Sequence, residues 1–139
     1  MRILAIDYGK RRVGLALSDP SETVASPLPM IDRKTTVGWR AVLLSQIALH
    51  EVAEIVLGLP KNMDGSAGSA AEDCQRIGQW LRDETGLPVV LLDERLTSVA
   101  AHASLREGGT RQRQGRQMVD SIAASLLLQV HLQLRQRRE

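Results

Sequence analysis

The fold class that the sequence predicts is α/β: a mixed five-stranded sheet, with three antiparallel strands followed by two parallel strands, flanked by helices. Two observations lead to this prediction. Three strand-like apolar segments follow one another at the start of the chain, as in an antiparallel meander. Two later apolar strands alternate with helical segments, and such crossover connections require parallel neighbours. The 139 residues are expected to form a single domain, residues 1–139.

The antiparallel part is predicted from the first 31 residues. Residues 2–8 and 13–19 are both apolar, and the short polar turn "GKRR" between them indicates a hairpin. A third strand is expected at residues 23–31. It contains Pro27 and Pro29, which cannot donate a backbone hydrogen bond and so confine the strand to an edge or a bend.

The parallel part alternates helical periodicity with short apolar segments. The second helix is bounded by Gly86 and Pro88, which stop a helix. A Gly- and Arg-rich segment near the C-terminus predicts a flexible basic loop, and the basic tail at residues 135–139 is a candidate for disorder. We expect strands at 54–60 and 88–94, loops at 61–69 and 108–117, and helices at 37–51, 69–85, 97–107 and from about Met118 onward.

Composition is that of a globular protein, with 43% hydrophobic and 24% charged residues. No apolar segment approaches the length of a membrane span, and no leader segment is visible, so we expect a cytoplasmic protein without a membrane partner. The single cysteine, Cys74, fits a reducing compartment and excludes an internal disulfide.

The charge distribution suggests contact with a polyanion. The net charge is only +2, but arginines and lysines gather at residues 10–12, 106–116 and 135–138. Such clusters attract phosphate backbones, although each alone is also typical of a solvated surface. The chain has one Tyr, two Trp and no Phe, which argues against a row of base-stacking aromatic residues. A nucleic acid would therefore be bound mainly through its backbone.

Acidic residues stand at three positions where a carboxylate is costly unless it is paired. Asp7 ends the first strand, Asp93 and Glu94 end the last strand, and Asp120 lies early in the final helix. At about 100° per residue, Asp120 falls at the edge of an apolar stripe of that helix. The stripe consists of Val119, Ile122, Ala123, Leu126, Leu127, Val130 and Leu134.

Each acid alone has an ordinary explanation, such as a turn cap, a helix-dipole contact or an ion pair with Arg95. Together they suggest a site, because ligands bind at the carboxyl ends of parallel strands. Carboxylates without His or Cys partners suit Mg²⁺ or Mn²⁺. Such ions serve phosphoryl transfer, so the residues predict a metal-dependent nuclease.

Four segments in order resemble one known family: "AIDYGKRRVGLALSD", "IVLGLPKNMDGS", "LLDERLTSVAA" and "MVDSIAASLLL". The chain is similar over essentially its whole length to the YqgF/RuvX family, whose members are described as Holliday-junction resolvases or as nucleases that process the 5′ end of pre-16S ribosomal RNA. The resemblance implies an RNase H-like fold and a site made of Asp7, Glu94 and Asp120. Whether Glu94 or Asp93 faces the metal is left open, because adjacent strand residues point to opposite faces.

The resemblance and the charge pattern together give a set of expected nucleic-acid contacts. They lie in the first turn, in the "PKNMDGS" loop, beside the second acid and in the basic segment. The set consists of Lys10, Arg11, Lys61, Asn62, Arg95, Arg111, Arg113 and Arg116. For the "PKNMDGS" loop, a turn that satisfies only its own backbone is an equally good interpretation.

Two other classes of protein compete with a nuclease. A phosphate-binding hairpin after "IDYG" is similar to that of sugar kinases, but those proteins need two such domains. A non-catalytic RNA-binding factor in ribosome assembly would carry the same acids and basic segments. The substrate is precursor ribosomal RNA or, alternatively, branched DNA. The absence of an evident dimer face favours a monomer or weak homodimer, and a symmetric dimer is what junction cleavage usually needs.

Overall fold

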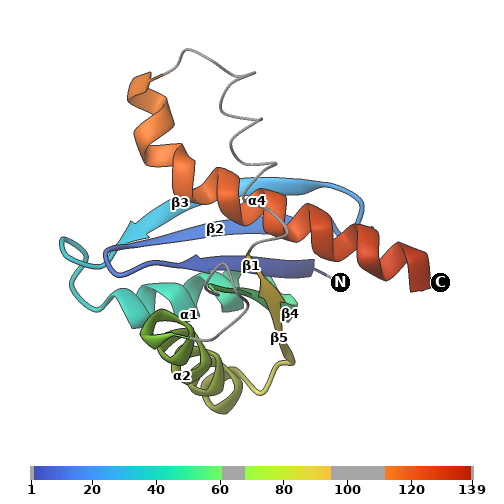
Figure 1. Ribbon diagram of the computed structural model, residues 1–139, viewed down its shortest axis with the longest axis horizontal. Helices are drawn as coiled ribbons and strands as arrows, with labels where there is room; N and C mark the ends of the chain where they lie inside the picture. Colours follow the sequence, from blue (N-terminus) through green and yellow to red (C-terminus); the bar gives the residue numbers. More distant parts are fainter. Residues whose placement is uncertain (1, 61–67, 95–111, 139) are drawn as a thin grey trace.

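The computed structural model describes residues 2–60, 68–94 and 112–138 (Figure 1). Its five strands are β1 (Arg2–Tyr8), β2 (Arg12–Ser18), β3 (Ala25–Asp32), β4 (Val52–Leu59) and β5 (Val89–Asp93). The helices within these residues are α1 (Trp39–Leu49), α2 (Ser69–Thr85) and α4 (Gln112–Arg138). The helix expected at 97–107 lies outside the described residues.

The strands form one sheet in the order β3-β2-β1-β4-β5. The pairs β1–β2 and β2–β3 are antiparallel, whereas β1–β4 and β4–β5 are parallel. This arrangement confirms the predicted mixed sheet, and it places the proline-containing β3 at an edge. Because β1, β4 and β5 run in the same direction, their carboxyl ends meet at the same edge of the sheet.

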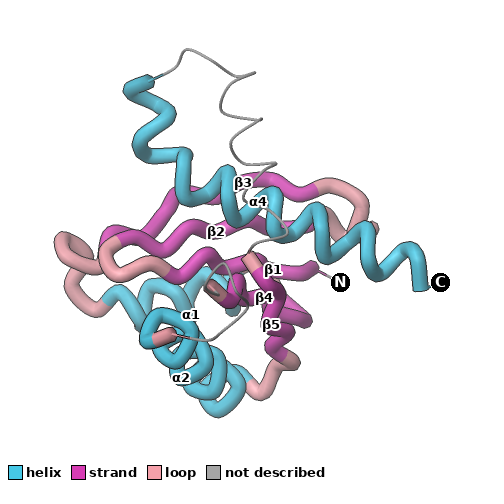
Figure 2. The backbone as a smooth tube through the Cα atoms, viewed as in Figure 1, coloured by secondary structure: helices cyan, strands magenta, loops and turns pink. Residues whose placement is uncertain are grey.

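Helices cover both faces of the sheet (Figure 1, Figure 2). Alternation of side chains along β1 shows the two layers: Leu4 and Ile6 pack with residues of α1 and α2, whereas Ile3 and Ala5 pack with residues of α4. The side chains of all four are at most 1% exposed. A residue's place in a strand therefore decides which helical layer it meets.

Helix α4 differs from the sequence prediction at its start. It begins at Gln112 rather than at about Met118, so residues 112–117 are helical and do not form the expected basic loop. Gln and Arg are good helix formers, and the single Gly115 within the helix costs only about 1 kcal/mol relative to alanine. The helix also continues to Arg138, so residues 135–138, the greater part of the candidate disordered tail, are helical.

The buried face of α4 is also rotated from the predicted stripe. Leu134, which the periodicity placed inside, is 38% exposed, whereas Leu128 is fully buried. Ser121 and Ser125 are buried as well, and the Ser121 hydroxyl donates a hydrogen bond of 2.6 Å to the carbonyl of Leu28 in β3. Small residues let the helix approach the sheet closely. The prediction of the buried face used apolar side chains only, so it did not show that these serines face inward.

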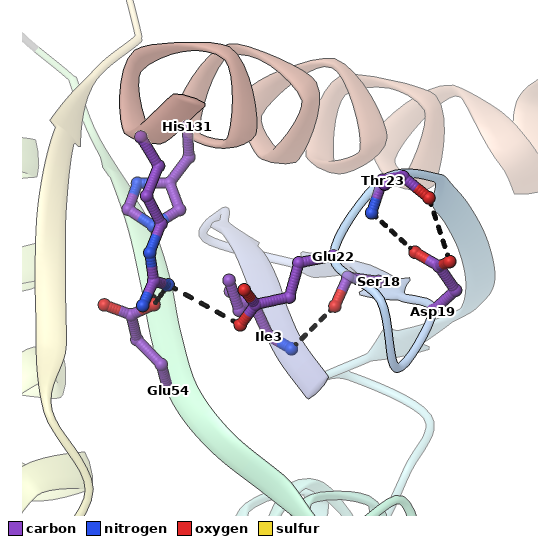
Figure 3. Close-up of polar contacts among 8 residues, drawn as sticks. Ile3, Ser18, Asp19, Glu22, Thr23, Glu54 and His131 are labelled. Atoms are coloured by element: carbon purple, nitrogen blue, oxygen red, sulfur yellow. Dashed lines mark hydrogen bonds and ion pairs between the residues drawn. The ribbon is translucent and has the colours of Figure 1, made fainter. Parts of the chain in front are cut away.

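Ionic contacts fix the C-terminal half of α4 to the sheet (Figure 3). The Arg135 guanidinium donates to Glu54 of β4 at 2.6 Å and lies 3.7 Å from Glu22, which belongs to the β2–β3 connection. His131, one turn earlier, lies 3.5 Å from the same Glu54 carboxylate. These contacts join three distant segments of the chain at one end of the helix.

The corrected helix face is tested by a pair of leucine truncations. We expect Leu128→Ala to lower the free energy of unfolding by about 2–5 kcal/mol, because it leaves a cavity in the core. Leu134→Ala, the matched control on the same helix, is expected to change it by about 0.5 kcal/mol or less. Urea unfolding measures both values. Equal losses in the two variants would contradict the helix face described above.

Candidate active site

Asp7 is held rigidly at the carboxyl end of β1. It pairs with Gly14 of β2, and it continues the alternation of Ile3 and Ala5, so it lies on the face of the sheet that α4 covers. Tyr8, the next residue, lies on the opposite face and packs against the α1/α2 layer. The β-strand before Asp7 therefore fixes both the position and the direction of its carboxylate.

Glu94 reaches the same place from β5. Leu92 packs against the α4 layer and Leu91 against the α1/α2 layer, so alternation directs Glu94 to the face of Asp7 and Asp93 to the other face. The Glu94 amide donates to the carbonyl of Leu59 at 3.1 Å, which extends the β4–β5 pairing by one residue. Of the two acids that the sequence left open, Glu94 is the one that faces Asp7.

Gly58 of β4 makes room for this arrangement. A Cβ atom at this position would lie 2.7 Å from Oε1 and 2.9 Å from Cγ of Glu94, so any larger residue would displace that side chain. The Glu94 side chain therefore crosses the backbone of the strand that lies between β1 and β5. Sequence reasoning did not identify Gly58 as a site residue, although a glycine inside a buried strand is a signal of close approach.

The carboxyl groups of Asp7 and Glu94 are hydrogen-bonded to each other. Burial raises the pKa of Glu94 to about 8, and the contact with Asp7 adds to this effect. Two carboxylates this close cannot both be ionised at low cost unless a cation or a proton lies between them. Hard oxygen donors with excess negative charge are the ligands that Mg²⁺ and Mn²⁺ prefer, so the pair fits a divalent metal ion.

The third predicted acid, Asp120, belongs to α4, and its side chain lies outside the described residues. Its backbone is placed by the neighbouring Ser121, which is hydrogen-bonded to Leu28. Leu28 stands in one row with Leu15 and Ile6, the row that directly precedes Asp7. At this point α4 therefore crosses β3, two strand spacings or about 10 Å from β1. Among the side chains that the structure describes, no group of three acids, histidines or cysteines is arranged to hold a metal ion.

The structure describes only some of the expected nucleic-acid contacts. Lys10 is exposed in the β1–β2 turn, three residues after Asp7. Arg11 is also exposed but lies 3.5 Å from the Asp32 carboxylate, so it has a protein partner. The remaining predicted residues are not tested: Arg113 and Arg116 belong to α4 with side chains outside the described residues, and Lys61, Asn62, Arg95 and Arg111 lie wholly outside them.

The order and directions of the five strands, with helices on both faces, are those of an RNase H-like fold, and two solved structures share this arrangement. The chain matches RuvC of T. thermophilus, in a complex with Holliday junction substrate, with a TM-score of 0.62 and 14% identity over 99% of this chain and 96% of that one. The fowlpox virus Holliday junction resolvase matches with a TM-score of 0.57 and 12% identity over 98% and 99%. At these identities the likeness concerns the fold.

The chain belongs to the RuvX family, because the family model, described as Holliday junction resolvase, matches residues 1–134. A relative from Moorella thermoacetica is 42% identical over 132 residues, covering 95% of this chain and 94% of the relative. Another, from Lachnospira eligens, is 40% identical over 140 residues, covering 99% and 100%. Both relatives carry the name "Putative pre-16S rRNA nuclease". In the described part of the chain, no helix combines the length and apolar character of a membrane span.

The close approach at Gly58 predicts the behaviour of Gly58→Ala. The added methyl group is expected to move the Glu94 carboxyl away from Asp7, so the pKa of Glu94 should fall from about 8 toward its ordinary value of 4.5. A carboxyl-carbon NMR titration of the metal-free protein measures this pKa. A matched control is Gly78→Ala on the opposite layer, where the methyl group would meet Leu57 at 3.3 Å.

The same shift predicts a change in stability with pH. A glutamate whose pKa is raised on folding stabilises the native state below the unfolded pKa, and this contribution is lost as the pH rises through the folded pKa. The metal-free protein should therefore lose stability between about pH 4.5 and 8, and Gly58→Ala should lose less over that window. An unchanged Glu94 pKa in Gly58→Ala would contradict the described contact.

Proposed function

We propose that the protein is a metal-dependent nuclease that hydrolyses phosphodiester bonds in nucleic acid. The contact between the half-buried Asp7 and Glu94 carboxyls carries this proposal, because two adjacent carboxyl groups offer the oxygen donors and the negative charge that a divalent cation prefers. Membership of the RuvX family and the likeness of the fold to RuvC support it. Neither alternative class, a kinase-like protein or a passive binding factor, requires this pairing of acids.

In this proposal Asp7, Glu94 and Asp120 hold one or two Mg²⁺ or Mn²⁺ ions. When bound, such ions activate water and neutralise the charge that develops on the phosphate. The chain's own residues position the acids. Strands β1 and β5 hold Asp7 and Glu94 on one face, and the hydrogen bond from Ser121 to β3 fixes the backbone of α4 next to Asp120. Lys10 and the other predicted cations bind the phosphates that flank the cut.

The substrate we propose is the 5′ end of precursor 16S ribosomal RNA, as the names of the relatives suggest. A role in ribosome biogenesis would place the protein in the cytoplasm, acting as a monomer or weak homodimer. The description of the RuvX family favours a second candidate, a resolvase that cuts branched DNA. Resolution of a four-way junction needs two symmetric cuts, so this candidate requires a dimer.

Separate replacement of the two adjacent acids by their amides tests the assignment of Glu94. We expect Glu94→Gln to reduce cleavage by about a hundredfold or more, the scale for losing one preorganised charged group. Asp93→Asn is the matched control, and it should retain cleavage because Asp93 is directed to the opposite face. Rates are measured on labelled RNA with excess metal. The reverse ranking of the two variants would overturn the assignment.

Metal binding is measured separately through thermal stability. A ligand that binds only the folded protein stabilises it by about 2.7 kcal/mol at a hundredfold excess over its Kd. Mn²⁺ should therefore raise the Tm of the wild-type protein but not that of Asp7→Asn. We also expect Asp7→Asn to lose cleavage and to retain nucleic-acid binding. Without metal it should be more stable than the wild type only above about pH 8, where Glu94 ionises and like-charge repulsion is removed. An equal Mn²⁺ effect on both proteins would exclude Asp7 as a ligand.

A side-by-side assay separates the candidate substrates. Precursor 16S RNA and a four-way DNA junction are incubated with the protein, with and without Mn²⁺. We expect Mn²⁺-dependent cleavage of the RNA at its 5′ end and little cleavage of the junction. Paired cuts in the junction would favour the resolvase instead. Binding of RNA without cleavage of either substrate would support the non-catalytic assembly factor.

A further inference from the structure

The three aromatic residues of the chain meet at one place, on the α1/α2 side of the sheet, and two arginines lie between them. The Arg33 guanidinium lies 4.8 Å from the ring centres of both Tyr8 and Trp39. The Arg40 guanidinium lies 5.4 Å from Trp39 and 4.9 Å from Trp80. These five residues, here called the aromatic–arginine ladder, join β1, α1, α2 and the β3–α1 connection through alternating rings and cations.

The ladder opens into a pocket of about 520 Å³. Its walls are formed by residues of five segments: Tyr8, Lys10, Arg33, Arg40, Asp73, Arg76, Ile77 and Trp80. Four of these side chains are cationic, and the one carboxylate, Asp73, is paired with Arg76 at 2.5 Å. The pocket therefore combines an excess of positive charge with the rings of Tyr8 and Trp80.

Hydrogen bonds hold the polar part of this pocket in place. Arg33 donates to the carbonyl of Gly9 at 2.9 Å, and its amide donates to the carbonyl of Arg11 at 2.7 Å. The amide of Gly9 in turn donates to the carbonyl of Arg12 at 2.9 Å, closing the turn that carries Lys10. The guanidinium of Arg33 is thus positioned before any ligand arrives, which lowers the entropic cost of binding.

The pocket lies next to the candidate active site but on the other face of the sheet. Tyr8 follows Asp7 directly, about 3.8 Å along the backbone, and alternation turns the two side chains to opposite faces. Lys10, in the turn that follows, lines the pocket. A nucleic-acid strand bound at Asp7 can therefore continue around the carboxyl end of β1 and reach the ladder on the other face of the sheet.

We propose that this pocket binds an unpaired nucleotide of a single-stranded segment of the substrate, with its base stacked on the ring of Trp80 and its phosphates held by Lys10, Arg40 and Arg76. The inference deepens the proposed nuclease function and rests on it for the identity of the bound strand. Unpaired bases expose ring faces that aromatic and guanidinium planes can stack on, whereas duplex bases are already stacked. The ladder thus assigns to the aromatic residues the recognition role that their small number argued against.

Binding is measured without metal, so that cleavage does not interfere. The probes are fluorescein-labelled single strands of about 12 nucleotides, as RNA and as DNA, an abasic strand of the same length, and a blunt duplex. Anisotropy gives the Kd of each probe. The two tryptophans, Trp39 and Trp80, both belong to the ladder, so quenching of tryptophan fluorescence reports occupation of the pocket directly. A comparison of the Kd values for the RNA and DNA probes shows which of the two nucleic acids supplies the single strand.

We expect Trp80→Leu and Arg76→Gln each to weaken single-strand binding, by about tenfold for the loss of stacking. Neither should change duplex binding by more than about twofold, and the abasic strand should bind weakly and be insensitive to Trp80→Leu. Lys34→Gln is the charge-matched control, because Lys34 is exposed and adjacent to Arg33 but does not line the pocket. Arg76 is 72% exposed, so its variant keeps the test valid even if Trp80→Leu folds poorly.

Equal binding of the abasic and normal strands, or an equal loss in Lys34→Gln and Arg76→Gln, would overturn the proposal. Tryptophan fluorescence that does not change on saturation with either single strand would also overturn it. Failure of the nuclease function is distinguishable, because a protein that cleaves no substrate can still show the selective loss in Trp80→Leu. Conversely, if Trp80→Leu cleaves the substrate and binds single strands as tightly as the wild type, the proposed role of the pocket is wrong but the nuclease function is not.

Discussion

The contact between the Asp7 and Glu94 carboxyls is the interaction on which the candidate site depends. It exists because β1 and β5 lie on either side of β4 and end at the same edge, and because Gly58 of β4 lets the Glu94 side chain cross between them. In a buried setting this contact is unfavourable unless a proton or a cation is shared. The raised pKa of Glu94 lets a shared proton stabilise the pair at neutral pH, and in the proposed function a metal ion takes the place of that proton.

The two faces of the sheet pack against different helices around this contact. One face, to which alternation directs Asp7 and Glu94, is the face that α4 packs against, with Ser121 contacting β3 and Arg135 contacting β4. On the other face α1 and α2 enclose the larger core and carry the aromatic–arginine ladder. Cys74 of that core stays a neutral thiol, because burial and the nearby carboxylates raise its pKa to about 12. In the proposed function, side-chain alternation along β1 places the metal site on one face of the sheet and the nucleotide-binding pocket on the other.

The sequence predicted the sheet well because its strands are short, strongly apolar and bounded by turns, and alternation along a strand is a local property. It predicted the positions of Asp7 and Glu94 for the same reason. The buried face of α4 was misjudged because Ser121 and Ser125 face inward, and hydrophobicity does not reveal a serine that hydrogen-bonds to the sheet. The ladder was missed because its residues are distant in the sequence and only folding brings them together.

The central claim is that the Asp7 and Glu94 carboxyls form one cation site on the α4 face of the sheet. Anomalous diffraction from a crystal of the protein soaked in Mn²⁺ tests it most directly. The account predicts a manganese peak within coordination distance, about 2.0–2.2 Å, of one oxygen of Asp7 and one of Glu94. A peak bound to Asp93 on the opposite face, or no peak between the two carboxyls at saturating Mn²⁺, would contradict it.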